Sequence, residues 1–209
     1  MKKIIIVDYG LGNVRSAEQS LKRAAEENCF KINVKISKNF KDINESTHII
    51  LPGQGAFFSC MKGLKDMPGM IDALSENVLI KKKPFLGICV GMQLLAETSF
   101  ENGNHNGLGW IGGQIKKIPN RNLKLPHMGW NNVIIKKTND LIKEDPQNNF
   151  YFVHSYYFDC KFSDNEIATT KYGLSFSSII AKENIYGTQF HPEKSSTQGL
   201  RVLNNFLNL

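Results

Sequence analysis

Several short segments of this chain are apolar at almost every position instead of alternating with polar residues. The clearest are Lys3–Val7, His48–Leu51, Pro84–Ile88 and Ile185–Phe190. A strand with two apolar faces has to be covered on both sides, which is typical of parallel sheets that lie between layers of helices. Apolar residues at helical spacing lie between the early segments, so the chain is predicted to be an α/β protein with a parallel sheet.

The other elements are predicted from the same two periodicities. The region from about residue 110 to 180 has few helix signals and is expected to add antiparallel strands to the same sheet. No repeat or linker divides the chain, so we expect one domain over residues 1–209. Helices are expected at Asn13–Ala25, Phe57–Leu64, Met70–Ile80, Met92–Thr98 and Thr197–Leu207, and further strands at Ile32–Ile36, Asn132–Ile135, Tyr151–Val153, Ile167–Thr170 and Ile179–Ala181.

The composition is that of an ordinary globular protein, with 41% hydrophobic and 22% charged residues in a chain of 209. No segment approaches the roughly 18 apolar residues of a membrane span. The first apolar run, Ile4–Val7, is too short to be the core of a signal peptide. We therefore expect a cytoplasmic protein that does not contact a membrane.

The net charge of +7 raises the question of nucleic-acid binding. The basic residues occur in short scattered clusters, such as Lys81–Lys83, and no basic stripe is interleaved with aromatic residues. Clusters of this kind are usually solvated turns or helix ends. No nucleic-acid partner is expected.

Neither a metal nor a cofactor is expected from the motifs. The cysteines at positions 29, 60, 89 and 160 contain no C-x-x-C pair, which argues against a zinc site, and a disulfide framework is not expected either. The segment Gly10–Arg15 resembles a dinucleotide-binding loop, but Arg15 replaces the third glycine and no clear acidic residue ends the next strand. A glycine-rich turn between a strand and a helix is the better interpretation.

One cysteine lies in a pattern that is typical of a catalytic nucleophile. Cys89 follows an apolar strand, precedes a helical segment and has Gly87 and Gly91 two residues away on either side. This is the layout of a nucleophile elbow, in which small flanking residues let strand and helix cross at a strained turn. The nearby helix N-terminus would favour the thiolate, and the N–H of Val90 would point to the position of an oxyanion.

A thiolate needs a base, and His191 is the best candidate. It follows a strand-like segment and is followed by Pro192, which favours an extended backbone at His191. In an extended chain the side chains of residues i and i+2 point to the same side, so Glu193 could hydrogen-bond the imidazole as the third member of a triad.

These motifs together resemble the class I, triad-type glutamine amidotransferases. More narrowly, the chain resembles the glutaminase subunits of the synthase that makes imidazole glycerol phosphate in histidine biosynthesis. The resemblance implies a flavodoxin-like, mostly parallel sheet with added antiparallel strands and flanking helices. It covers nearly the whole chain through the segments I-V-D-Y-G-L-G-N-V-R-S, L-P-G-Q-G-A-F, L-G-I-C-V-G-M-Q-L-L, L-P-H-M-G-W-N, Y-F-V-H-S-Y and G-T-Q-F-H-P-E-K-S.

The resemblance also implies a role for each residue of the site. Cys89 attacks the side-chain amide of L-glutamine, His191 protonates the leaving ammonia and later activates water, and Glu193 orients His191. The backbone N–H groups of Val90 and Gln54 form the oxyanion hole. Many relatives have valine where this chain has Gln54, so activation of this loop could differ here. The residues implied in substrate binding are Gly55, Gln93, Glu101, His154, Ser155 and Tyr156.

The resemblance implies a heterodimer as well. Ammonia passes to a (β/α)8-barrel cyclase subunit, which forms imidazole glycerol phosphate and an aminoimidazole carboxamide ribotide. The residues implied at the interface with the cyclase are Asn13, Trp130, Tyr151 and Lys194.

Two other functions remain open from the sequence. A paralogue of the same subunit could supply ammonia for amidination of a bacterial surface sugar, and the glutaminase motifs do not separate it from the histidine-pathway subunit. A cysteine hydrolase or peptidase could have a similar elbow. Peptidases of this fold lack the H-P-E loop and have no need of Gln93 or Glu101.

Overall fold

The computed structural model describes residues 1–119, 123–143, 145 and 147–209, and its centre is a set of five parallel strands. The first four have the order 2-1-3-4 of flavodoxin-like sheets. The third and fourth strands in this order are buried at every position, as their continuous apolar sequences predict. The five strands are, in spatial order, β2 (Ile32–Ser37), β1 (Lys2–Val7), β3 (His48–Gly53), β4 (Phe85–Cys89) and β14 (Ile185–Thr188).

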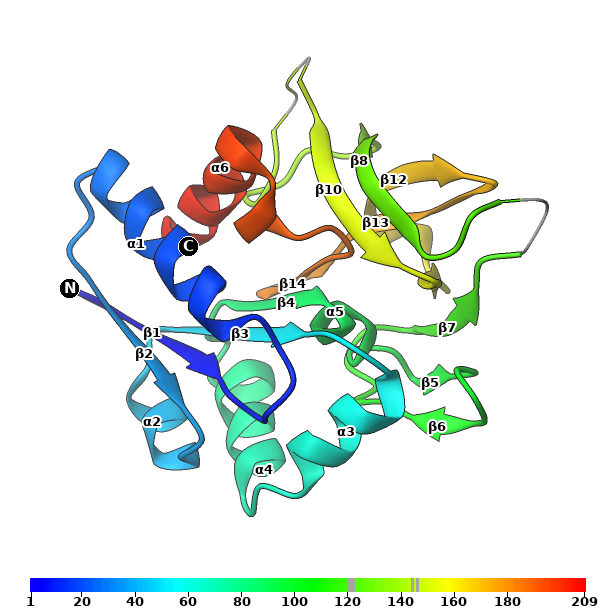
Figure 1. Cartoon of the computed structure of the whole chain (residues 1–209). Coiled ribbons are helices and arrows are strands. Elements are labelled where there is room, and N and C mark those ends of the chain that lie inside the picture. Colours follow the sequence, from blue (N-terminus) through cyan, green and yellow to red (C-terminus); the bar gives the residue numbers. More distant parts are fainter. Residues whose placement is uncertain (120–122, 144, 146) are drawn as a thin grey trace.

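Helices cover both faces of these strands (Figure 1), with α1 and α6 on one side and α2, α3 and α4 on the other. The predicted helix Met70–Ile80 is helical throughout, since α4 continues as a π-helix over Glu76–Ile80. The six-residue α2 was not predicted because it is too short to have a clear period. The bounds are α1 (Val14–Glu27), α2 (Phe40–Glu45), α3 (Phe57–Lys65), α4 (Met70–Ser75) and α6 (Ser196–Leu207).

Antiparallel strands extend the sheet beyond β14, as predicted for this region. Counting only described residues, the full sheet has twelve strands. β13 (Leu174–Lys182) pairs along one edge with β12 (Glu166–Tyr172). Along its other edge it pairs with β11 (Tyr156–Cys160) at Ser177 and then with β14 from Ile179 on. Short strands continue the sheet from β11 in the order β7 (Gly113–Lys117), β5 (Thr98–Ser99) and β6 (His105–Asn106), and β9 (Ile134–Ile135) pairs with the free edge of β12.

Two strands of the same region do not join this sheet, which corrects the prediction. β8 (His127–Asn132) and β10 (Asn149–His154) pair with each other in a separate antiparallel ribbon. The inward residues of β10 are aromatic: Phe150 stacks on Phe190 with ring centroids 4.0 Å apart, and Phe152 meets the Phe190 ring edge-on. Aromatic packing of one face therefore holds the ribbon over the carboxyl end of the central strands.

The predicted helix Met92–Thr98 is also wrong in extent. The helix here, α5, has only four residues, Val90–Gln93, and the chain is extended again in β5. After Gln93 the N–H groups of Leu95 and Ala96 bond to carbonyls three residues back, and Glu97 N–H then bonds to Gly113 O at 3.0 Å. Pairing with the segment of β7 thus ends the helix after one turn. None of the helices in the described part of the chain has the length and apolar character that a membrane span requires.

Candidate active site

The candidate site lies where β3, β4 and β14 end side by side. β4 is the middle strand, and its last residue, Cys89, is in register with Gly53 of β3. On the other side Ile88 is in register with Thr188, the last residue of β14. Carboxyl ends of parallel strands meet at one edge of a sheet, and ligands of open α/β sheets bind at this edge. The topology therefore brings the loop after β3 and the segment after β14 to opposite sides of Cys89.

Cys89 has the strained backbone of a nucleophile elbow. Its φ is 54°, a conformation that non-glycine residues rarely adopt. A Cβ atom built on Gly91 would lie 1.8 Å from Leu51 O, and one on Gly87 would lie 2.6 Å from Gly91 O. Both glycines are thus required by close backbone approach, as the G-x-C-x-G pattern predicts.

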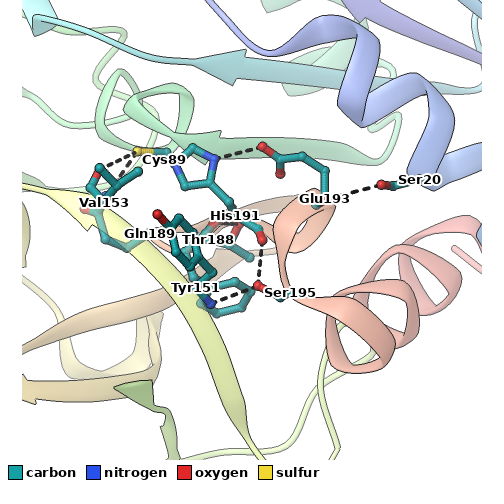
Figure 2. A network of polar contacts seen from close by, with 10 residues as sticks. Ser20, Cys89, Tyr151, Val153, Thr188, Gln189, His191, Glu193 and Ser195 are labelled. Carbon is teal, nitrogen blue, oxygen red and sulfur yellow. Dashed lines mark hydrogen bonds and ion pairs between the residues drawn. The ribbon is translucent and has the colours of Figure 1, made fainter. Parts of the chain in front are cut away.

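The predicted contact between His191 and Glu193 is present. His191 Nδ1 lies 2.8 Å from Glu193 Oε1, and both side chains are almost completely buried. The backbone differs from the expectation: His191 is extended, but Pro192–Lys194 form a turn of 3-10 helix, which we label η3. The turn brings Glu193 back to the imidazole. Figure 2 shows the His191 ring between the Cys89 side chain and Glu193.

The turn that carries His191 is held from three sides. His191 N–H donates to Tyr151 O at 2.9 Å, which ties the turn to β10. Ser195 Oγ donates to His191 O at 2.6 Å and accepts from Tyr151 N–H at 3.0 Å. Ser20 Oγ of α1 donates to Glu193 O at 3.4 Å. These bonds position the imidazole without involving its own nitrogens.

The electrostatics of the site favour a protonated His191. Burial lowers the pKa of its imidazole, but the charge of a Cys89 thiolate and the Glu193 carboxylate outweigh this and raise the pKa to about 10. His191 Nε2 is buried with no hydrogen-bond partner within the described residues. An imidazolium stabilises a neighbouring thiolate, and it can donate a proton to a leaving group.

A cavity of about 440 Å³ opens above Cys89. Most of the residues predicted for catalysis and substrate binding line it, together with Lys194 of the predicted interface and two residues, Pro126 and Val153, that were not predicted. Glu193 lies behind His191. Over the described residues no cluster of three or more histidine, cysteine or acidic side chains could hold a metal. The predicted residues along the cavity wall are Gln54, Gly55, Cys89, Val90, Gln93, Glu101, His154, Ser155, Tyr156, His191 and Lys194.

Two polar side chains of the cavity wall are fixed by bonds to the protein. Gln93 Nε2 donates to Tyr156 O at 2.9 Å and to Gln189 Oε1 at 3.0 Å. Glu101 Oε2 accepts from Phe57 N–H at 2.7 Å, at the first turn of α3. Both are held in place before any ligand binds, which reduces the entropic cost of binding.

His154 belongs to a buried chain of imidazoles. Its Nδ1 donates to Tyr156 O at 2.8 Å, so its Nε2 is an acceptor and receives His127 Nδ1–H at 3.0 Å. His127 Nε2 in turn accepts from Asn131 Nδ2 at 3.1 Å. Burial lowers the pKa of His154 to about 3 and that of His127 to about 4, so both rings are neutral at pH 7. This chain connects β8 to the cavity wall.

The loop after β3, which contains Gln54, is held from behind. Tyr9 Oη donates to Pro52 O at 2.7 Å, and Cys60 Sγ donates to Gln54 O at 3.3 Å. Burial raises the pKa of Cys60 to about 11, so its thiol keeps the proton that it donates. Gly55 has a φ of +91° with open space around it, so the loop turns where no side chain interferes.

Three of the four residues predicted for a partner interface form one surface group. Trp130 is 52% exposed and meets the Tyr151 ring edge-on, with centroids 6.3 Å apart. Lys194 Nζ lies 5.9 Å from the centroid of the same Tyr151 ring. Asn13, the fourth, precedes α1 and makes no side-chain capping bond. We call Trp130, Tyr151 and Lys194 the aromatic surface group.

Two groups that contact the sulfur were missed from the sequence. Gln189 Nε2 lies 3.7 Å from Cys89 Sγ, and the Val153 carbonyl lies 3.9 Å from it (Figure 2). Gln189 is two residues before His191, so the i, i+2 rule that found Glu193 could have found Gln189 as well. A backbone carbonyl such as that of Val153 leaves no signal in the residue types.

Comparisons with known proteins agree with this geometry. The family described as Glutamine amidotransferase class-I matches residues 5–209. Two proteins named Imidazole glycerol phosphate synthase subunit HisH are similar over nearly their full lengths: that of Rhodospirillum rubrum is 42% identical, covering 98% of each chain, and that of Methanosarcina acetivorans is 44% identical, covering 100% of each. A crystal structure of a glutamine amidotransferase matches with a TM-score of 0.72 at 18% identity, covering 98% of this chain and 97% of the other, and thus shows a common fold.

Proposed function

Because the chain belongs to the class I glutamine amidotransferase family, and within it to the HisH subunits of imidazole glycerol phosphate synthase, we propose that it hydrolyses L-glutamine through a thioester on Cys89. The ammonia then serves a cyclase subunit in histidine biosynthesis. The observation that carries this proposal is the cysteine at a φ of 54° beside the buried His191–Glu193 pair, in a cavity large enough for an amino acid.

The chemistry begins with attack of the Cys89 thiolate on the side-chain amide carbon of glutamine. The carbonyl oxygen becomes an oxyanion, for which the backbone N–H groups of Val90 and Gln54 are the proposed donors. His191 gives its proton to the amide nitrogen as the C–N bond breaks. Ammonia is released, and the glutamyl group remains bound to Cys89 as a thioester. His191 then takes a proton from water, the hydroxide attacks the thioester, and glutamate is released with the thiolate restored.

The cavity wall supports recognition of both ends of the substrate. The Glu101 carboxylate is suited to the α-ammonium of glutamine, because charge-assisted hydrogen bonds are the stronger ones. Both hydrogens of Gln93 Nε2 are already used, so Gln93 offers its Oε1 to a donor of the substrate. Gly55 and the segment His154–Tyr156 complete the proposed wall.

The aromatic surface group supports docking of the cyclase as a heterodimer. Tryptophan and tyrosine are among the residue types that dominate binding at interfaces, and here the exposed Trp130 lies against the half-buried Tyr151, with Lys194 near the same ring. Lys194 lines the cavity as well, and Tyr151 O accepts the His191 N–H bond, so the group is continuous with the site. A partner docked here, also against Asn13, would receive ammonia before water protonates it.

Removal of the nucleophile tests the reaction. The Cys89→Ala variant should release no ammonia from glutamine with the cyclase present, and it should still bind the cyclase. The exposed Cys29 offers a matched control, since Cys29→Ser should keep full activity. Measurable glutamine turnover by Cys89→Ala would contradict the thioester mechanism.

Complementation tests the pathway. The gene should restore growth without histidine to a strain that lacks its own glutaminase subunit, provided the matching cyclase is expressed with it. The gene with Cys89→Ala should fail to do so. Growth by neither gene, together with glutaminase activity in vitro, would favour the use of ammonia in another synthesis, such as amidination of a surface sugar.

A further inference from the structure

Two buried glutamine side chains lie end to end behind the sulfur of Cys89. Gln93 Nε2 donates one hydrogen to Tyr156 O and the other to Gln189 Oε1. The backbone carbonyl oxygen of Tyr156 can only accept a hydrogen bond, so the Gln93 amide must direct its NH₂ group, not its oxygen, towards Tyr156 and Gln189. Gln189 Oε1 must therefore face Gln93, and Gln189 Nε2 faces the opposite way.

Cys89 Sγ lies on that opposite side, 3.7 Å from Gln189 Nε2. Gln189 is completely buried, and its own backbone N–H donates to Ser178 O at 2.9 Å. Gln189 is thus held by two hydrogen bonds, one from its backbone N–H and one to its side-chain amide oxygen. Figure 2 shows Gln189 beside Cys89 and below His191, at the end of β14.

Tyr9, Cys60 and His191 are titratable groups that interact with the sulfur, and Glu101, His154 and Lys194 line the same cavity. Burial raises the pKa of Tyr9 well above its ordinary value and that of Cys60 to about 11, so both stay neutral at pH 7. The Val153 carbonyl can accept a bond from a thiol but offers nothing to a thiolate. Among the described side chains that contact the sulfur, the His191 imidazolium and the Gln189 amide are therefore the ones that favour its charged form.

We propose that Gln189 is a catalytic residue, whose Nε2–H donates to the Cys89 thiolate and holds the sulfur in its reactive position. This assignment depends on the proposed function in one respect, which is that Cys89 is the nucleophile. Its amide is oriented through Gln93, which also lines the substrate cavity. A donor fixed by protein contacts stabilises a charge without reorganising when the reaction starts.

The test measures the thiolate directly rather than the turnover of glutamine. Iodoacetamide alkylates a thiolate by displacement of iodide, so the rate rises with pH as the thiol ionises. We would follow the Cys89 peptide by mass spectrometry, because Cys29 is exposed and reacts as well. The variant Gln189→Met keeps the length of the side chain and removes the donor.

The midpoint of Cys89 alkylation should move upward by about one pH unit in Gln189→Met, which is about a tenfold lower rate at pH values below the midpoint. Gln189→Glu can still accept from Gln93 but turns an acceptor towards the sulfur, so its midpoint should rise further. Ser178→Ala is the matched control: it removes a buried hydroxyl next to Gln189 that has no hydrogen-bond partner among the described residues, and it should leave the profile unchanged.

Either Gln189 variant suffices if the other does not fold. A wild-type profile in a folded Gln189 variant would overturn the proposal, and so would an equal shift in Ser178→Ala, which would indicate a general disturbance of packing. Failure of the proposed function looks different: the alkylation profiles would shift as expected while the wild-type protein releases no ammonia from glutamine.

Discussion

Single residues of the site are constrained by sterics more than by charge. Cys89 adopts a φ of 54° because the segments on both sides of it approach each other too closely for any other path. Gly91 lies directly against the backbone of β3, and a side chain there has no space. This packing maintains the strain at Cys89, the proposed nucleophile, as is common at active sites.

The elbow can be tested through Gly91→Ala. We expect a loss of roughly 3 kcal/mol in the free energy of unfolding, because the new Cβ would overlap Leu51 O and force α5 away from β3. Urea unfolding measures this loss. Gly109→Ala is the control, since Gly109 has a positive φ but open space around it, and it should lose only about 1 kcal/mol. Gly91 itself has no positive φ, so a loss no larger than that of Gly109→Ala would mean that the structure relieves the overlap with Leu51 O by small shifts.

Glu101→Gln separates binding from chemistry. The amide can still accept the Phe57 N–H bond that the carboxylate now accepts, so the local fold should survive. Loss of the charge should raise KM for glutamine about tenfold, as expected for a charge-assisted hydrogen bond. Steady-state kinetics with the cyclase present would show this. A fall in kcat at constant KM would remove Glu101 from the binding site.

Among the elements, the β8–β10 ribbon packs against the site with one face and exposes the other face to solvent. The inner face carries Phe150 and Phe152, which pack under the site, and the carbonyl of Tyr151 holds the His191 turn. The outer face exposes Met128 and Trp130. Any partner that binds the outer face therefore contacts an element that is hydrogen-bonded to His191, the proposed base.

Trp130→Ala tests the outer face. Because a large exposed aromatic would be lost from the aromatic surface group, affinity for the cyclase should fall at least about tenfold. Binding can be measured by titration calorimetry, with the fold checked by circular dichroism. Phe162→Ala is a close control: Phe162 is 54% exposed and has Lys161 over its ring, but it lies outside the group. Unchanged affinity of Trp130→Ala would rule out docking on this face.

The whole molecule should lose stability in acid because of its buried neutral histidines. Burial lowers the pKa of His48 and His127 to about 4 and of His154 to about 3. The unfolded chain binds their protons below about pH 6.5 and the folded chain does not, so their contribution is full above that pH and is lost as pH falls towards 4. His191, with its raised pKa, acts in the opposite direction, since its contribution is lost as pH rises through about 10.

Urea unfolding at pH 7.5 and pH 5.0 measures the balance. Each of the three neutral histidines should lower the free energy of unfolding by about 2 kcal/mol at pH 5.0, and His191 offsets about 1 kcal/mol of this sum, so the net decrease should be roughly 5 kcal/mol. In His127→Gln, which can still donate to His154, the difference between the two pH values should be smaller. An equal free energy at both pH values in the wild-type protein would contradict the assignment of neutral buried rings.

The sequence by itself determined the parallel core, the elbow and the His191–Glu193 contact. These depend on local patterns: β3 and β4 are apolar throughout, Gly87 and Gly91 flank Cys89 closely, and Glu193 is two residues from His191. The family motifs extended this to most of the cavity wall.

The tertiary structure alone decided the end of α5 after one turn, the separation of β8 and β10 from the main sheet, the His127–His154 chain and the contact of Gln189 with the sulfur. Each of these depends on partners distant in the chain, such as Gly113 for α5 and Phe190 for β10, and residue types along one segment do not encode which distant segment will pack against it.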